Sequence, residues 1–363
     1  MLAYQLEGIG SYIHEIVRHW LTENPDIKWT LIFDRKLDYF ERFDCDRVVL
    51  SPKTSHTLSI AYWNEVPLTS WLHKNKPDIY FSPDGFIPLR SNVKCVPVVH
   101  DVAALVFPQY MRLRDYLYYR AFQVKMIRRA WCVITVSEFS KTEIIKCAKV
   151  SEEKVHAVYN GVQKALSQGS SDEKDLASHG ISGPYFIYIG SIHPRKNVHG
   201  LLASFRIYRE QGGQHDLVLC GRKAWKTQDI DDLLADTVIK EHIHHLDYVP
   251  SQALSDLLRG AVALVYVSHY EGFGLPVLEA MAAGVPVITS SNSAMSEFGK
   301  DAVLSADPLD HETIADSMLN LESDENLRAS LIAKGLEQST DLTYLNASQK
   351  ILKIMKSKLY ETS

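Results

Sequence analysis

The sequence predicts an α/β protein made of two successive units, each with a mostly parallel sheet. Short apolar segments of strand length alternate with amphipathic helical segments along nearly the whole chain. This alternation is typical of strands joined by right-handed crossover helices. The polar stretch KALSQGSSDEKDLASHGISGP, rich in Gly and Ser, interrupts the alternation near the middle and predicts a linker over residues 164–184. With 363 residues, the chain is long enough for two domains.

The first predicted domain covers residues 1–163. Its expected strands are short apolar runs at residues 29–33, 48–50, 79–82, 95–99, 131–136 and 155–159. Its expected helices begin after Gly10 and cover residues 61–73, 112–130 and 138–147. Ser137 precedes the last of these helices and is a typical N-cap residue.

The second predicted domain covers residues 185–343 and contains the segment EGFGLPVLEA. An apolar strand (residues 261–268) leads into a glycine-bearing loop with Glu271, and a helix with Glu279 follows Pro276. In open α/β sheets, ligands bind where such loops leave the strands. Loop amides and a helix N-terminus suit a phosphate, while carboxylates accept hydrogen bonds from sugar hydroxyls. The alternative is a simple turn with one solvated and one helix-stabilising glutamate.

A second strand-loop-helix segment opens the same domain. The strand at residues 185–189 is followed by Gly190, a polar loop, and a helix that begins near Asn197. Arg195 and Lys196 stand beside the helix N-terminus, an unfavourable place for cations unless an anion is shared. Two fixed cations and free amides predict a diphosphate site without a metal. The alternative is a solvated basic loop.

Seven motifs in this sequence together resemble those of the retaining glycosyltransferases of family 4, which have two facing Rossmann-like domains, the GT-B architecture. The motifs are GIGSYIHEIV (8–17), VVHDVAALVFPQY (98–110), VITVSEFSK (133–141), VYNGV (158–162), GSIHPRKN (190–197), LVLCG (217–221) and EGFGLPVLEAMAAGVPVITS (271–290). They occur in the order that the family shows and run along nearly the whole chain.

The resemblance implies a retaining, metal-independent transfer of a sugar from a nucleotide-diphosphate donor. Arg195 and Lys196 would neutralise the leaving diphosphate, Glu271 would accept hydroxyls of the transferred sugar, and Glu279 would accept those of the ribose. The backbone amides that would line the sugar and phosphate belong to Phe273, Gly274 and Leu275. We find no DxD-like pair placed to hold a divalent metal, and we expect no cofactor.

The remaining expected site residues follow from the same resemblance. His100 ends an apolar strand and would contact the transferred sugar, although a structural histidine is the alternative. Gly8 and Gly10 would lie near the donor phosphates, where a simple helix start is the alternative. Base recognition is expected near Gly221 and Tyr248–Val249, largely through backbone atoms, with Gly190 at the phosphate loop. Asn160 and Gly161 resemble the family's hinge, and the last segment (344–363) would be a helix packed on the first domain.

The sequences of the segments SIHPRKN and HDVAALVFPQY are most similar to those of bacterial mannosyltransferases of this family. The expected donor is therefore GDP-mannose, and the product an α-mannoside in surface polysaccharide or glycolipid biosynthesis. A UDP-sugar donor remains an alternative. A sugar-nucleotide epimerase, or a non-catalytic partner of another transferase, is a further one. Thus the expected partners are the nucleotide sugar and a glycan or lipid-linked acceptor.

Composition argues against other partners and compartments. The net charge of −5 suggests no attraction to nucleic acid. Five scattered cysteines without a CxxC motif suggest a reducing compartment, and no apolar run approaches membrane-spanning length, so we expect a cytoplasmic protein. Residues 112–129 carry six basic residues and one acidic residue among apolar ones. Such a helix can lie on the inner face of the cytoplasmic membrane, or simply present a solvated basic face opposite a core-facing stripe.

The start of the sequence predicts a missing element. A glycine loop like that at Gly8 normally follows the first, central strand of the sheet, but only MLAYQLE precedes it. Seven residues at about 3.3 Å each are too few for a strand of usual length with a connecting turn. We therefore expect either a translation start upstream of Met1 or a truncated, less stable form.

Overall fold

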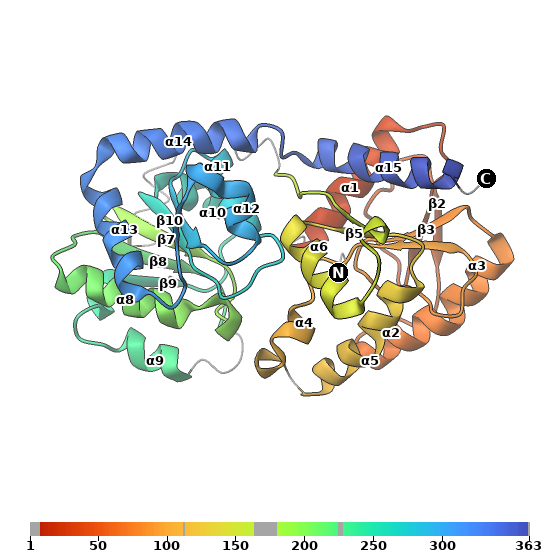
Figure 1. The fold of residues 1–363 in the computed structure, drawn as a ribbon, viewed down its shortest axis with the longest axis horizontal. Coiled ribbons are helices and arrows are strands. Elements are labelled where there is room, and N and C mark those ends of the chain that lie inside the picture. Colours follow the sequence, from red (N-terminus) through yellow and green to blue (C-terminus); the bar gives the residue numbers. More distant parts are fainter. Residues whose placement is uncertain (1–7, 112, 163–179, 224–227, 362–363) are drawn as a thin grey trace. The chain divides into compact units, whose positions relative to one another are not determined.

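The computed structural model describes residues 8–111, 113–162, 180–223 and 228–361 (Figure 1). The chain divides into two compact units. The first unit consists of Met1–Gly161 and Tyr344–Ser363, and the second of Val162–Thr343. The segment before Gly8, which was expected to be too short for the usual first strand, lies outside the described residues, as does most of the predicted linker.

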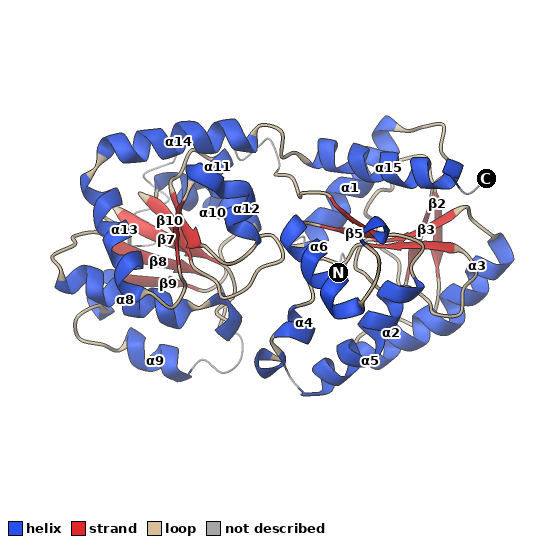
Figure 2. Ribbon diagram, in the orientation of Figure 1, coloured by secondary structure: helices blue, strands red, loops and turns tan. Residues whose placement is uncertain are grey.

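The first unit alternates short strands with helices (Figures 1 and 2). Its strands are β1 (Thr30–Phe33), β2 (Asp46–Val49), β3 (Ile79–Ser82), β4 (Lys94–Pro97), β5 (Val133–Thr135) and β6 (Val155–Ala157). Its α-helices are α1 (Ile9–Glu23), α2 (Thr57–Trp63), α3 (Thr69–Asn75), α4 (Ala103–Val106), α5 (Leu113–Arg129), α6 (Glu138–Ala148) and α15 (Tyr344–Glu361). The strands pair in parallel as β1–β2, β3–β4 and β5–β6. A hydrogen bond from Val99 N to Ile134 O (2.8 Å) links the last two pairs.

One expected helix is interrupted. Residues 61–73 were expected to be a single helix, but a π-helical turn, Asn64–Leu68, separates α2 from α3. Pro67 lies inside this turn. Proline lacks an N–H and its ring clashes with the carbonyl four residues earlier, so the wider turn relieves a conflict that a regular helix could not.

The last helix belongs to the first unit and packs on α1. The Trp20 indole in α1 donates to the carbonyl of Ser348 in α15 (2.8 Å). Tyr12 and Tyr344 meet edge to face, with ring centroids 6.4 Å apart. Ile351 of α15 is fully buried. Helix α15 thus packs against α1 and completes the core of the first unit.

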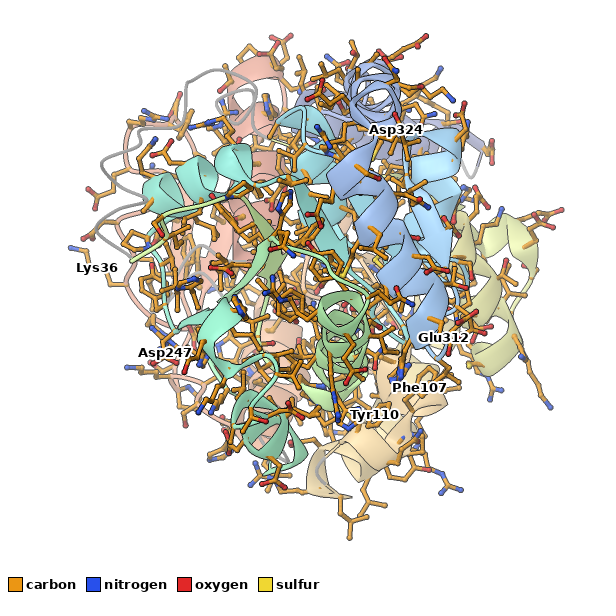
Figure 3. All side chains as sticks on the ribbon, turned by 90° about the vertical axis from the view of Figure 1, so that its left-hand side faces the viewer. Lys36, Phe107, Tyr110, Asp247, Glu312 and Asp324 are labelled. Carbon is orange, nitrogen blue, oxygen red and sulfur yellow. The ribbon has the colours of Figure 1, made fainter. Side chains whose placement is uncertain are left out.

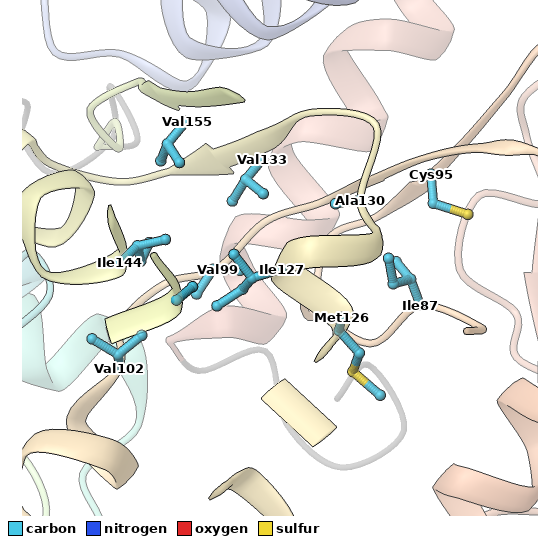
Figure 4. Packing of buried hydrophobic residues seen from close by; sticks show 11 residues of the cluster. Ile87, Cys95, Val99, Val102, Met126, Ile127, Ala130, Val133, Ile144 and Val155 are labelled. Atoms are coloured by element: carbon cyan, nitrogen blue, oxygen red, sulfur yellow. The ribbon is translucent and has the colours of Figure 1, made fainter. Parts of the chain in front are cut away.

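A compact apolar cluster fills the space between α5, α6 and the strands of the first unit (Figure 4). Its residues come from β4, α5, β5, α6 and β6 or from the loops between them, and include Cys95, Ile127, Val133, Ile144 and Val155. All five are at most 1% exposed. Burying one large aliphatic side chain contributes roughly 1.5–3 kcal/mol, so this cluster holds the strand ends in place.

The second unit is a six-stranded parallel sheet with helices on both faces (Figure 2). Its strands are β7 (Tyr185–Ile189), β8 (Asp216–Cys220), β9 (Ile243–Leu246), β10 (Ala263–Tyr266), β11 (Val287–Ser290) and β12 (Leu304–Ala306). Its α-helices are α8 (Val198–Glu210), α9 (Gln228–Leu234), α10 (Ser251–Gly260), α11 (Leu275–Ala282), α12 (Ala294–Gly299), α13 (His311–Ser323) and α14 (Glu325–Ser339). Asp324, labelled in Figure 3, caps α14 by accepting from Leu327 N (2.9 Å).

The strand order of this sheet is β12-β11-β10-β7-β8-β9. Strands β7 and β10 are neighbours although two other strands separate them in sequence. The chain therefore winds outwards in opposite directions from this pair of strands. Such a switch point is where open parallel sheets bind ligands.

Candidate functional site

The loops that follow β7 and β10 are joined by hydrogen bonds at the switch point. Arg195 Nη1 donates to the carbonyl of Tyr270 (2.6 Å), and His269 N donates to the carbonyl of Arg195 (3.0 Å). Two predicted motifs that lie more than 70 positions apart in sequence are thereby brought together in one site.

Glu271 stands at the centre of this site and binds both predicted cations. Its Oε2 lies 3.1 Å from Arg195 Nη1, and its Oε1 lies 2.8 Å from Lys196 Nζ. The hydroxyl of Tyr266, at the end of β10, donates to Oε1 (3.0 Å) and also contacts Lys196 Nζ. Two cations and one anion leave this cluster with a net positive charge.

The environment of Glu271 keeps it ionised. Burial alone would raise the pKa of this carboxyl, but Arg195, Lys196 and the Tyr266 hydroxyl together lower it to about 2. Burial raises the pKa of Tyr266 well above its usual value, so at neutral pH the hydroxyl keeps its proton and can donate. The cluster therefore holds a fixed negative charge between two fixed positive ones.

Asn197 fixes the backbone that carries the two cations. It adopts a left-handed conformation (φ 55°) between the short 3₁₀ turn Pro194–Lys196 and α8. Its Oδ1 accepts from Gly200 N (3.2 Å), and its Nδ2 donates to the carbonyls of Val267 (2.9 Å) and Pro308 (2.8 Å). From the sequence, Asn197 was expected only to mark the start of a helix. Its position directly after the Arg-Lys pair, as a residue that tolerates the left-handed region, was the available signal.

Glu279 lies one turn into α11, in a different environment from Glu271. It is partly buried, and its carboxyl group has no hydrogen-bond or ion-pair partner among the described residues. Burial raises its pKa to about 7. Gly274 precedes the helix in the left-handed region (φ 95°), and Pro276 occupies its first turn. An unpaired carboxyl near a helix start suits a ligand that supplies hydrogen-bond donors.

The other predicted residues of the second unit differ in their exposure. Phe273 is buried and stacks on Phe298 (4.6 Å), and Leu275 is partly exposed at the first turn of α11. Tyr248 is 45% exposed, whereas the Val249 side chain is buried, so only the backbone of Val249 is available to a ligand.

Gly190 and Gly221 form a close backbone contact at the ends of β7 and β8. A Cβ atom on Gly221, which has φ 155°, would lie 1.9 Å from the carbonyl oxygen of Gly190. The two loops could not approach in this way if Gly221 carried any side chain. Gly221 is therefore structurally required at this contact, whatever its role toward a ligand.

His100, Gly8 and Gly10 belong to the first unit. His100 follows β4 and is partly buried. Its Nε2 donates to the carbonyl of Pro83 (2.9 Å), and its ring meets the edge of Tyr12 at 4.9 Å. Burial lowers the pKa of His100, so at neutral pH it is uncharged with Nδ1 as an acceptor. Gly8 caps α1 with φ 50°, and Gly10 is buried in its first turn.

Within the described ranges, no group of three or more His, Cys, Asp or Glu side chains is arranged to hold a metal ion. The same part of the chain contains no helix with the length and apolar character needed to cross a bilayer. The arrangement at the switch point can bind an anionic ligand through Arg195 and Lys196, and Glu279, in the helix that follows Glu271, can accept hydroxyl groups.

Two family models match the chain, one for each unit. Residues 6–166 match Glycosyltransferase Family 4, and residues 171–338 match Glycosyl transferases group 1. The chain is 28% identical to O-antigen chain mannosyltransferase B of Escherichia coli, over 98% of this chain and 97% of that protein.

Solved structures share the fold at low sequence identity. Sucrose-phosphate synthase from Thermosynechococcus elongatus superposes with a TM-score of 0.79 at 17% identity, covering 98% of this chain and 94% of that one. HepE from Anabaena, solved with UDP and glucose, gives a TM-score of 0.75 at 15% identity, with 97% of each chain covered. The predicted α/β class with GT-B architecture is thus confirmed.

Proposed function

This chain belongs to glycosyltransferase family 4, and from that premise we propose that it transfers mannose from GDP-mannose with retention of anomeric configuration. The acceptor is a glycan or a lipid-linked glycan, and the product is an α-mannoside of a surface polysaccharide or glycolipid. The mannosyltransferase activity of the Escherichia coli relative in O-antigen synthesis supports this choice of sugar and pathway class.

The observation that carries the proposal is the cluster of Arg195, Lys196 and Glu271 at the switch point. The two cations face an anionic leaving group without needing a metal ion. Charge develops on a diphosphate as its bond to the sugar breaks. Fixed cations in a partly dehydrated site therefore stabilise the transition state more than the ground state.

The transfer breaks the bond between the anomeric carbon and the diphosphate oxygen, and forms a bond from that carbon to the acceptor oxygen. Both events occur on the same face of the sugar, and the acceptor proton passes to the leaving phosphate oxygen. Glu271, which pairs with Arg195 and Lys196, accepts hydroxyls of the transferred sugar. The amides of Phe273, Gly274 and Leu275 border the phosphate.

Glu279 and His100 contact other parts of the substrates. Glu279, whose carboxyl group has no partner within the described ranges, accepts the ribose hydroxyls of the donor. His100 offers an unprotonated Nδ1 to a hydroxyl of the transferred sugar, since its Nε2 is occupied by Pro83. Gly8 and Gly10 leave the start of α1 open to the donor phosphates, and Asn160–Gly161 forms the hinge.

Contact with a membrane surface suits a lipid-linked acceptor. Tyr118, Met126 and Ile127 of α5 face the core, whereas Leu113 and Leu117 are 71% and 52% exposed. The basic residues Arg114, Arg120, Lys125 and Arg128 are also exposed. Exposed leucines among cations suit an anionic bilayer surface. We infer a cytoplasmic protein that associates peripherally with the inner face of the membrane.

The test is a donor screen with the purified protein. GDP-mannose, GDP-fucose, UDP-glucose and UDP-N-acetylglucosamine are each incubated with a lipid-linked acceptor extract. Release of nucleoside diphosphate is measured, and the anomer of the product is determined by NMR. Transfer from GDP-mannose to an α-linked product is expected. Transfer only from a UDP-sugar, as the UDP-bound Anabaena structure would suggest, would overturn the choice of donor but not the reaction class.

A further inference from the structure

The end of β9 and the loops after β8 and β9 border a cavity that is open to solvent and that the switch-point cluster does not use. Its volume is 480 Å³, and it is lined by Arg222, Lys223, His245 and Asp247. It opens at the same carboxyl edge of the sheet as the loops of Arg195 and Glu271, because all six strands are parallel. Base recognition was expected near Gly221 and Tyr248–Val249 largely through backbone atoms, but the side chains that line this cavity are polar.

The distance between this cavity and the cluster of Arg195, Lys196 and Glu271 suits the distance between the base and the diphosphate of a nucleotide. Strands β8 and β9 are the next two neighbours of β7 in the sheet. Adjacent strands are about 4.8 Å apart, so the cavity begins roughly 5–10 Å from the loop that carries Arg195 and Lys196. A ribose bridges about this separation between a 5′-diphosphate and its base.

Two of the lining side chains have unused hydrogen-bonding capacity. Asp247 lies at the surface of the second unit (Figure 3), with its side chain 78% exposed and its Oδ1 3.9 Å from His245 Nε2. The guanidinium of Arg222 stacks over the exposed Tyr248 ring at 4.8 Å and has no hydrogen-bond acceptor among the described residues.

The other two lining side chains are already occupied. Lys223 is paired with Asp231. His245 Nε2 donates to the carbonyl of Gly221 (3.1 Å), which fixes the imidazole at the cavity wall. Two groups therefore remain available to a ligand: the guanidinium of Arg222 as a hydrogen-bond donor, and the carboxylate of Asp247 as an acceptor.

We propose that this cavity binds the nucleobase and that Asp247 selects guanine. The proposal rests on the proposed use of a nucleotide-sugar donor and specifies which base it carries. Guanine presents two adjacent donors, N1–H and N2–H₂, which match the two oxygens of one carboxylate. It also presents the acceptors O6 and N7, which match a guanidinium fork. Uracil has a single N3–H between two carbonyl oxygens, and these oxygens repel the Asp247 carboxylate.

Inosine diphosphate (IDP) separates the two contacts, because it keeps O6, N7 and N1–H but lacks the N2 amine. The experiment measures dissociation constants of GDP, IDP and UDP for the full chain by titration calorimetry. We expect the parent protein to bind GDP about tenfold more tightly than IDP, and IDP more tightly than UDP. Asp247→Asn is expected to weaken GDP binding about tenfold to a hundredfold and to bring the GDP-to-IDP ratio close to one. UDP affinity should not fall.

Two further variants make the test specific. Arg222→Ala should weaken GDP and IDP equally and keep their ratio, since both bases present O6 and N7. Glu312→Gln makes the same charge change in α13, which follows the opposite edge strand β12, and should alter nothing. Since Asp247 is exposed, Asp247→Asn should melt like the parent.

A parent protein that does not distinguish GDP from IDP would overturn the inference, as would an Asp247→Asn variant that keeps the parental ratio. Either result leaves mannose transfer untouched, because that is read separately from product formation. Conversely, selective GDP binding without mannose transfer would contradict the proposed function while supporting the role of Asp247.

Discussion

Glu271 and Glu279 belong to one strand-loop-helix segment, yet their carboxyl groups have opposite electrostatic environments. Glu271 is held by two cations and a tyrosine hydroxyl, with its pKa lowered to about 2. Glu279 has no such partner among the described residues, and burial raises its pKa to about 7. One glutamate is permanently charged at neutral pH, and the other titrates there.

Nucleotide binding should therefore depend on pH near neutrality through Glu279. An ionised carboxylate accepts hydroxyl groups better than a neutral acid, so GDP affinity should rise as the pH increases from about 6 to 8. Glu279→Gln should remove most of this dependence. Dissociation constants at a series of pH values for both proteins provide the measurement. A parallel pH profile in the two proteins would argue against this role.

The same residue should affect stability in the opposite direction. The pKa of Glu279 in the folded state is raised above its unfolded value of 4.5, so protonation of this carboxyl favours the folded state. This contribution to the free energy of unfolding is fully present below pH 4.5 and is lost as the pH rises through about 7. The shift corresponds to a difference on the order of 3 kcal/mol. Denaturant unfolding of the Glu279→Gln variant should show a smaller decline in the free energy of unfolding between pH 4.5 and 7 than the parent shows.

Arg195→Ala and Lys196→Ala should each weaken binding of the nucleoside diphosphate. Each removes a charge-assisted contact worth about 1.5–3 kcal/mol, or roughly tenfold to a hundredfold in affinity. Glu271→Gln should instead lower turnover while diphosphate binding stays at least as strong, because the anion that shares the cations is neutralised. Calorimetry with GDP and initial transfer rates measure the two effects. Weaker GDP binding by Glu271→Gln would show that its carboxylate positions the cations for the ligand.

Chelation of metals should leave the transfer rate unchanged. The proposed charge neutralisation comes from Arg195 and Lys196, and the described residues offer no cluster suited to a metal. Rates before and after dialysis against EDTA, with and without added magnesium or manganese, provide the measurement. A rate that returned only with added metal would contradict the proposed mechanism.

The packing of α5 allows a stability test with an internal control. Ile127 is fully buried in the cluster shown in Figure 4, whereas Leu117 on the same helix is 52% exposed. Ile127→Ala should cost about 2–5 kcal/mol of the free energy of unfolding. Leu117→Ala should change it by less than about 0.5 kcal/mol. Equal losses in the two variants would mean that Leu117 is covered by a partner.

Local sequence patterns predicted the elements well where apolar runs and turn residues agree. The expected strand at residues 79–82 is β3, and the predicted cap Ser137 accepts from Ser140 N at 2.9 Å. The predicted helix at 61–73 was partly wrong, because Pro67 forces a wider turn that amphipathic spacing does not reveal.

The contacts that make the candidate site were harder to predict than its residues. Arg195 and Glu271 were each identified from their own segments, but their ion pair depends on β7 and β10 becoming neighbours. The hydroxyl of Tyr266 was missed because the residue sits within an apolar strand. The raised pKa of Glu279 arises from packing around α11, which no local pattern records.

The second unit begins and ends at one point of the fold. Val162 N donates to the carbonyl of Leu342 (3.0 Å), and Val162 pairs with Thr343 in a parallel bridge. The second unit is thus inserted between two segments of the first unit, whose last helix, α15, follows it in sequence. A fragment covering Val162–Thr343 has its two ends paired with each other and is the natural choice for expressing the second unit alone. A truncation before Tyr344, by contrast, removes α15 from the other half, so C-terminal deletions should damage the half farthest from them in sequence.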